Sequence, residues 1–217
     1  MKKALTVKTL CTEARIFAKN LSGIGIPELY GVSDGKAVGT YVEHRFQEHL
    51  HKSYDYEEGN SARGIDFPKL QVDMKVTLIK QPQSSCPFKS ARQKIYGLGY
   101  SLLIFVYEKE DNSKTNTAHL DFLHAVFVNK TKTADYQTTM GLRDILSRDG
   151  NTDDIIAYLM ERHLPVDDIQ ASQLAEKIIK NPPEIGYLTI SNALQWRLQY
   201  NRVIQKAGKI EGIKKII

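Results

Sequence analysis

A short apolar run in the middle of the chain fixes the kind of core that this sequence can form. Leu102–Tyr107 is the longest apolar run among the 217 residues, far shorter than the roughly 20 residues of a membrane-spanning helix. Its length instead indicates a strand buried on both faces, over Tyr100–Tyr107. A second strand is expected over Leu120–Val128, after a charged turn over Glu108–Thr117. The sequence therefore predicts a covered β-sheet.

Two amphipathic helices are expected before this sheet. Apolar residues in Val7–Leu21 recur at intervals of three and four, which places them on one helix face. In Ala37–His51 the apolar stripe has strict fourfold spacing. It consists of Val38, Val42, Phe46 and Leu50. Glu43 lies beside this stripe, so its carboxylate is expected at the rim of a buried face.

A hairpin is expected between the second helix and the buried strand. Gly64–Phe67 is predicted as a short strand that turns at Pro68 and Lys69 into a longer strand, Leu70–Ile79. A short helix is expected over Ala91–Tyr96. The resulting order of helix, hairpin, helix, strand and strand predicts an α/β core.

Beyond Thr138 the pattern changes to helices only. They are expected over Leu142–Ser147, Asp153–His163, Asp168–Ile179 and Ser191–Gln205. We place a boundary near residue 135, which gives an α/β core over 1–135 and a helical subdomain over 136–217. The last two helices resemble the pair of a helix-turn-helix. In that arrangement the candidate DNA contacts are Gln195, Arg197, Gln199 and Arg202. A dimer interface, or a brace for the core, is an equal alternative.

The composition points to a polyanionic partner and a reducing compartment. The 30 Lys and Arg residues exceed the 25 Asp and Glu residues, and the pI is near 9.0. Such a balance favours nucleic acid as a partner. Cys11 and Cys86 lie far apart without metal-ligand spacing, so neither a disulfide framework nor a zinc site is expected. Ala4–Arg15 lacks the apolar stretch of an export signal, and a cytoplasmic protein is expected.

The strand Gln71–Leu78 carries the residues with the clearest chemistry. Its alternation puts Asp73 and Lys75 on one face, and a hairpin partner would bring Asp66 beside them. Two carboxylates, with the backbone carbonyl of Met74, form an oxygen site for Mg²⁺ that suits phosphodiester hydrolysis. Lys75 would orient or deprotonate the nucleophile, or bind the phosphate. The plainer alternative is a solvated strand face with alternating charge.

The segment after this strand is rich in groups that contact DNA. Residues 81–94 combine amides, hydroxyls and basic side chains at the mouth of the expected site. The candidates are Ser84, Ser85, Lys89, Arg92 and Gln93, of which Arg92 and Gln93 rank first. An ordinary polar turn that caps a helix explains the same residues equally well.

The motif Gly64–Pro68 followed by Val72–Lys75 resembles the signature of the PD-(D/E)XK nuclease superfamily, and most closely its type II restriction endonucleases. The chain departs from it at Ile65, where the motif has Pro, and at Asp73, where many members carry Glu; both variations occur in the family. The resemblance covers about residues 36–130. It implies a restriction-endonuclease-like core, a mixed central sheet flanked by helices, in which Glu43 is an additional acidic residue from a helix.

The resemblance also implies a function. We expect Mg²⁺-dependent, sequence-specific double-strand cleavage of DNA by a homodimer, with a cognate DNA methyltransferase as partner. The implied catalytic residues are Glu43, Asp66, Asp73 and Lys75, with the metal held by Asp66, Asp73, the Met74 carbonyl and Glu43. A repair nuclease or junction resolvase of the same superfamily is one alternative. Another is a non-enzymatic DNA-binding protein that uses the basic C-terminal helices.

Overall fold

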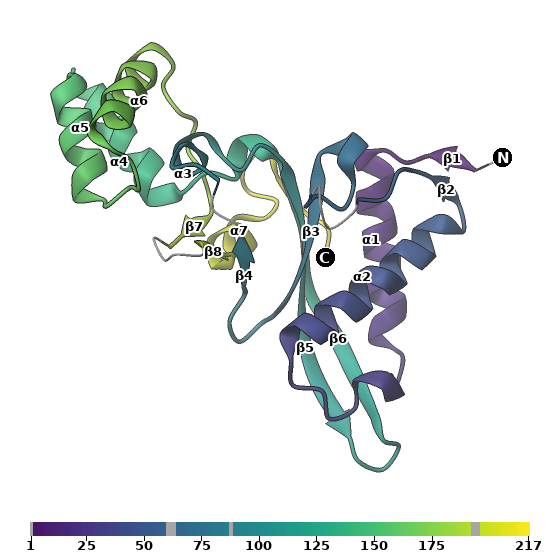
Figure 1. The fold of residues 1–217 in the computed structure, drawn as a ribbon. Coiled ribbons are helices and arrows are strands. Elements are labelled where there is room, and N and C mark those ends of the chain that lie inside the picture. The colour runs from purple at the N-terminus through teal and green to yellow at the C-terminus, as the bar shows by residue number, and fades with distance from the viewer. Residues whose placement is uncertain (1, 60–63, 87–88, 192–195) are drawn as a thin grey trace.

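The computed structural model describes residues 2–59, 64–86, 89–191 and 196–217. At its centre is a four-stranded mixed sheet in the order β3-β5-β6-β9. Its strands are β3 (Val72–Leu78), β5 (Ser101–Asn112), β6 (Thr117–Val128) and β9 (Ile213–Lys215). β3 runs parallel to β5, whereas the β5–β6 and β6–β9 pairs are antiparallel. With helices on both sides of this sheet, the expected α/β class is confirmed (Figure 1).

One face of the sheet is covered by the two long N-terminal helices (Figure 1). These are α1 (Val7–Ser22) and α2 (Gly35–His51), close to the expected bounds. The apolar stripe of α2 is fully buried in the first core cluster, together with Val72, Met74 and Phe105 of the sheet. A 3₁₀ turn, η1 (Pro27–Leu29), lies between α1 and α2 in the chain. A short parallel pair, β1 (Lys3–Ala4) and β2 (Tyr54–Asp55), lies beyond these helices.

A second, smaller sheet packs against the other face. It has the order β4-β8-β7, formed by β4 (Gln83–Cys86), β8 (Trp196–Gln199) and β7 (Thr189–Ile190). The helix α7 (Asn201–Lys206) follows β8 directly. Side chains of this sheet and of β5 form a second core cluster, in which Trp196 and Leu198 are buried beside Ile104. Figure 1 shows this layer on the side of the central sheet opposite α1 and α2.

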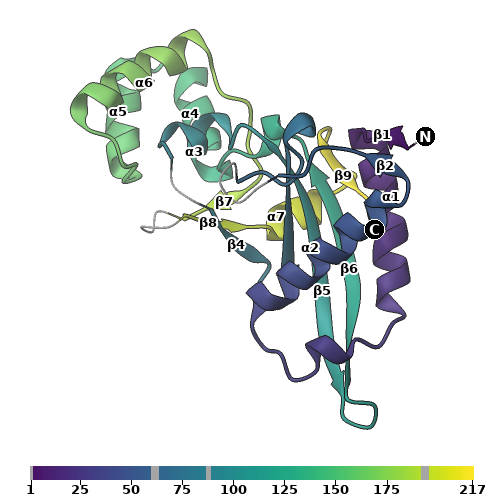
Figure 2. The same ribbon diagram turned by 45° about the vertical axis from the view of Figure 1, so that its right-hand side comes forward.

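The remaining helices form a third core that stands apart from the central sheet (Figures 1 and 2). They are α3 (Arg92–Tyr96), α4 (Tyr136–Ser147), α5 (Thr152–Glu161) and α6 (Asp168–Lys180). A 3₁₀ turn, η3 (Lys130–Lys132), precedes α4. In the ranges described, no helix has both the length and the apolar content that crossing a bilayer requires.

Asp135 joins this helical part to the second sheet. Its buried carboxylate accepts hydrogen bonds from the Thr138 amide at 2.8 Å and the Thr138 hydroxyl at 2.7 Å, which caps α4. The other oxygen accepts from the Ile190 amide of β7 at 2.8 Å. One side chain therefore satisfies donors from two elements.

We expect Asp135→Ala to lower the free energy of unfolding by roughly 2–4 kcal/mol, because it removes a helix cap and leaves a buried N–H without its acceptor. Urea denaturation would measure the change. Asp34→Ala is the matched control, since Asp34 caps α2 from an exposed position with one hydrogen bond, and its loss should cost only about 1 kcal/mol. Equal losses for the two variants would contradict the role of Asp135.

Two expected elements take another form between residues 64 and 117. The hairpin is wrong: Phe67 and Val72 form a single bridge, and η2 (Pro68–Leu70) separates them. Pro68 has no N–H to pair with a neighbouring strand. The turn at Glu108–Thr117 is also wrong, because β5 continues to Asn112 and β6 begins at Thr117. The projecting end of this pair is exposed, so charged side chains are tolerated in both strands.

The expectation of helices only beyond Thr138 holds for α4, α5 and α6 but is wrong for the end of the chain. In place of a helix over Ser191–Gln205, the described residues form β8 and the short α7, so no helix-turn-helix is present there. Buried and exposed side chains alternate from Trp196 to Tyr200, which is the period of a strand. Two strands from beyond residue 135 pair with strands from before it: β8 with β4, and β9 with β6. The domain boundary near residue 135 stays a prediction.

Candidate active site

The candidate site lies at an open edge of the central sheet. β3 is the first strand in the sheet order, and β5 is its neighbour on one side. The expected alternation is confirmed: Val72 and Met74 face the core under α1 and α2, whereas Asp73 and Lys75 face the other way. The alternation of the strand thus places both polar side chains on the face opposite the first core, where Asp73 is buried and Lys75 is partly exposed.

Asp73 and Lys75 form an ion pair within that face. The Lys75 Nζ lies 2.7 Å from the Asp73 Oδ2, and the Asp73 side chain is only 5% exposed. Burial raises the pKa of Asp73 to about 7, although the charge of Lys75 opposes the shift. Burial lowers the pKa of Lys75, but the charge of Asp73, its hydrogen bond and the charge of Asp66 outweigh it, so that the net pKa is raised. Lys75 therefore carries its proton in the resting site.

Asp66 reaches the same place from the turn before β3. Its Oδ2 accepts a hydrogen bond from the Met74 amide at 2.6 Å, which fixes the carboxylate against the strand. The charge of Asp66 raises the pKa of both Asp73 and Lys75, so the three groups lie within electrostatic reach of one another. The proximity expected from a hairpin thus arises from a turn and a side-chain hydrogen bond.

Glu43 approaches from α2. Its neighbours Val42 and Phe46 are buried against the sheet, which leaves Glu43 half-buried at the margin of the helix. The pKa of Glu43 is raised by burial, then by the charge of Asp66 and a hydrogen bond with it; His44 and Lys75 oppose the shift. Three carboxylates from a helix, a turn and a strand therefore meet beside one lysine.

The chemistry of these donors fits a hard divalent cation. In the described part of the chain, no three His, Cys, Asp or Glu side chains are already disposed around a common metal position. Asp66 instead binds the Met74 amide, and Asp73 binds Lys75. The charge of Asp66 nevertheless raises the pKa of both Glu43 and Asp73, and a bound cation would relieve this repulsion. The Met74 carbonyl as a further ligand stays a prediction.

Near Asp73 lies a group of hydroxyl and thiol side chains that was not predicted from the sequence. The Tyr100 hydroxyl lies 3.7 Å from the Cys86 Sγ, and the Ser84 hydroxyl is hydrogen-bonded to the Tyr200 hydroxyl. Burial is the main cause that raises the pKa of both phenols, those of Tyr100 and Tyr200. The nearby Cys86 raises the pKa of Tyr100 further, and the charge of Asp73 contributes to both shifts. The neutral hydroxyls of Tyr100 and Tyr200 thus lie within electrostatic reach of Asp73. Cys86 is buried.

The structure separates the candidate DNA contacts into two groups. Ser84, Gln93 and Arg202 are engaged within the protein: Ser84 with Tyr200, Gln93 with the Lys89 amide, and Arg202 with the Tyr136 ring, 3.7 Å from its centroid. The exposed candidates are Ser85, Lys89, Arg92, Arg197 and Gln199. Ser85 and Arg197 are partners in the β4–β8 register. Gln195 lies outside the described residues.

A mixed sheet with carboxylates and a lysine gathered at one edge strand is the arrangement of a PD-(D/E)XK nuclease, consistent with the resemblance of its motif. A family model described as "Type II restriction enzyme NspV" matches residues 4–215. The type II restriction enzyme NspV of Nostoc sp. is 60% identical over 209 residues, covering 96% of this chain and 95% of the relative. The chain belongs to the NspV family of type II restriction enzymes.

Among solved structures, the crystal structure of the tetrameric restriction endonuclease SfiI bound to cognate DNA is similar over 96% of this chain and 80% of that chain. The two share 12% sequence identity, with a TM-score of 0.46.

Proposed function

We propose that this type II restriction enzyme hydrolyses phosphodiester bonds of double-stranded DNA at a specific sequence with Mg²⁺. The observation that carries the proposal is the meeting of Glu43, Asp66 and Asp73 beside Lys75 at the open edge of β3. An edge strand leaves room for a DNA backbone, and carboxylate oxygens are the ligands that Mg²⁺ prefers. Sequence-specific cleavage accords with the family to which the chain belongs.

In this proposal Asp66 and Asp73 hold the metal, and Glu43 contributes directly or through water. A divalent cation held there supplies positive charge against the charge that develops on the scissile phosphate and makes a nearby water more acidic. The protein contributes the placement of these oxygens. Asp66 is positioned by the Met74 amide, and Asp73 by the Lys75 ammonium.

Lys75 acts as a cation. Its raised pKa means that deprotonation is unfavourable near neutral pH, so a role as general base is the weaker assignment. Its ammonium can donate to an oxygen of the scissile phosphate or orient the attacking water. With 25% of its side chain exposed, Lys75 remains accessible from the open edge.

Double-stranded DNA is the proposed substrate, and a homodimer is the proposed assembly, because two copies of one site can cut both strands of a symmetric sequence. The formal charge of +5 favours this polyanion. Ser85, Lys89, Arg92, Arg197 and Gln199 offer exposed polar or basic side chains for its phosphates and bases. A cognate methyltransferase that protects host DNA belongs to the same proposal.

The test is incubation of the purified protein with a long DNA of known sequence, with Mg²⁺ or with EDTA, followed by gel electrophoresis. Discrete fragments are expected with Mg²⁺ and intact DNA with EDTA, because the carboxylates alone supply no positive charge to the phosphate. Restoring Mg²⁺ after EDTA should restore the same fragments. Cutting that persists in EDTA would contradict metal dependence, and a smear would contradict sequence specificity.

A further inference from the structure

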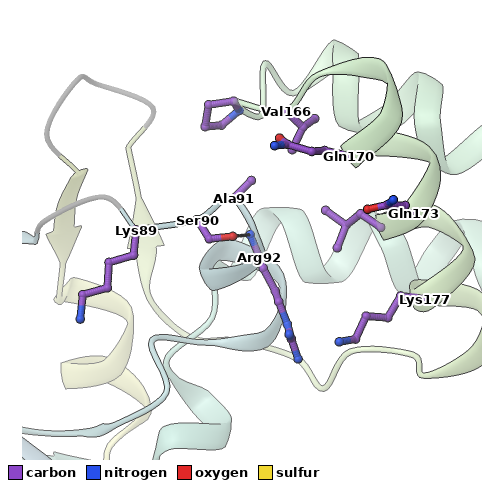
Figure 3. Close-up of a pocket in the computed structure, with 10 residues that line it drawn as sticks. Lys89, Ser90, Ala91, Arg92, Val166, Gln170, Gln173 and Lys177 are labelled. Atoms are coloured by element: carbon purple, nitrogen blue, oxygen red, sulfur yellow. Dashed lines mark hydrogen bonds between the residues drawn. The ribbon is translucent and has the colours of Figure 1, made fainter.

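A groove of about 520 Å³ runs between residues 89–92 and α6, outside the candidate active site. Gln170, Gln173 and Lys177 extend from α6 toward the segment with Ser90 and Arg92, as Figure 3 shows. None of these three α6 side chains was expected to have a function from the sequence. The groove is therefore lined by amides, a hydroxyl and basic groups that come from two separate parts of the chain.

Two cations share one aromatic ring at the end of this groove. The Arg92 Cζ and the Lys177 Nζ each lie 5.5 Å from the centroid of the Tyr96 ring. The Tyr96 hydroxyl donates to the Asn181 carbonyl at 2.9 Å, which fixes the ring. An aromatic face attracts a cation, but it carries no net negative charge. The ring therefore does not neutralise the two positive charges, and both groups can still bind an anion.

No ion pair offsets this charge within the described residues. None of the residues that line the groove is Asp or Glu. Elsewhere in the described ranges, no carboxylate forms an ion pair with Arg92 or Lys177. By contrast Lys180, one turn further along α6, is paired with Glu176 at 3.8 Å. The unbalanced positive charge is thus confined to the groove side of the helix.

The amides beside the cations suit a nucleic-acid strand. Gln170 and Gln173 are exposed and one helical turn apart, so both can face the same ligand. The Gln170 Oε1 accepts from the Asp167 amide at 3.4 Å, which leaves its NH₂ group free to donate outward. Side-chain amides and basic groups are common donors to phosphate oxygens in DNA complexes.

The groove also lies on the appropriate side of the molecule. β4 is tied to the end of β3, because the Thr77 hydroxyl accepts from the Gln83 amide at 3.0 Å, and Lys89 of the groove is three residues beyond the end of β4 in the sequence. Figure 1 shows α3 and α6 on the side of the central sheet where β4 and β8 lie. Asp73 and Lys75 face that side too, so one duplex can approach both places.

We propose that this groove is a second DNA contact, in which Arg92 and Lys177 bind a backbone phosphate while Gln170 and Gln173 donate to the same strand. The proposal rests on the proposed function, because it assigns DNA to the groove as well as to the cleavage site. It makes α6 part of the docking surface rather than a brace for the core.

The test is binding of a fluorescent duplex that contains the sequence cut by the wild-type protein, in EDTA, over a series of salt concentrations. Lys177→Ala should weaken binding about five- to tenfold at low salt and reduce the slope of log affinity against log salt by about one, because one phosphate contact is lost. Arg92→Ala should act in the same direction. Lys180→Ala, which removes the same charge outside the groove, should bind within about twofold of the wild type.

Thermal unfolding of each variant shows whether it is folded. Equal binding by the Lys177 variant and the wild type, or equal weakening by the Lys177 and Lys180 variants, would overturn the groove proposal while cleavage by the wild type still supported the proposed function. Failure of the wild type to bind or cut DNA would overturn both. Inorganic phosphate is the further probe. If its binding depends on Lys177 while Lys177→Ala leaves duplex binding unchanged, the groove is assigned to a small anion instead.

Discussion

Asp73→Asn is expected to abolish DNA cleavage, with a rate lower by about a thousandfold or more, while the protein still folds and binds its duplex. Asp73 supplies a proposed metal-ligand oxygen and holds Lys75 at 2.7 Å. Loss of the bound cation removes several kcal/mol of transition-state stabilisation, and about 4 kcal/mol corresponds to a thousandfold in rate. Asparagine keeps the shape of the side chain and can still accept a hydrogen bond from Lys75.

Single-turnover cleavage of a defined duplex with Mg²⁺ would measure this effect, with duplex binding in EDTA as the second readout. Asp121→Asn is the matched control, because it makes the same change at an exposed position on β6 and should cleave like the wild type. An Asp73→Asn protein that is folded, binds DNA and cuts at the wild-type rate would remove Asp73 from the site. Loss of folding would show that the ion pair is chiefly structural.

Phe46→Ala is expected to lower the free energy of unfolding by about 3–5 kcal/mol, since it leaves a cavity in the main core. The ring is fully buried and lies 5.0 Å from Phe17, 5.5 Å from Phe105 and 6.4 Å from Phe67, measured between centroids. It therefore joins α1, α2, the turn before β3 and the central sheet. Glu43 lies on the same helix, so cleavage should fall together with stability.

Urea denaturation followed by circular dichroism would measure the loss. His44→Ala is the control on the same helix: His44 is exposed, and its replacement should change the stability by at most about 0.5 kcal/mol. A loss below about 1 kcal/mol for Phe46→Ala would mean that the core repacks around the missing ring. The position of Glu43 would then not depend on that contact.

The elements that could be predicted from the sequence are those with a strong local pattern. The fourfold stripe of α2 buries one helix face, and the alternation of β3 directs its apolar residues into the first core, so local spacing was enough to place Glu43, Asp73 and Lys75 on their elements. The turn before β3 was harder. Asp66 lies beside Asp73 because its carboxylate binds the Met74 amide, and a side-chain hydrogen bond leaves no periodic signal.

Other features depend on contacts between distant parts of the chain. Trp196 and Leu198 alternate with polar residues, but the run is short enough to fit a helix as well, and only pairing with β4 decides for a strand. Tyr100 and Tyr200 come near Asp73 through the second sheet. Lys177 and Arg92 both lie near the Tyr96 ring. None of these relations can be deduced from spacing within one segment.

The pairing of β4 with β8 also bears on when the site acquires its electrostatic properties during folding. These strands are far apart in the sequence, and such non-local pairs form late because the intervening chain must first be ordered. Until they pair, Asp73 lacks the neighbouring Tyr200 hydroxyl, which follows β8 in the chain. Burial is the largest cause of the raised pKa of Asp73, so this shift is a property that tertiary structure confers on the site.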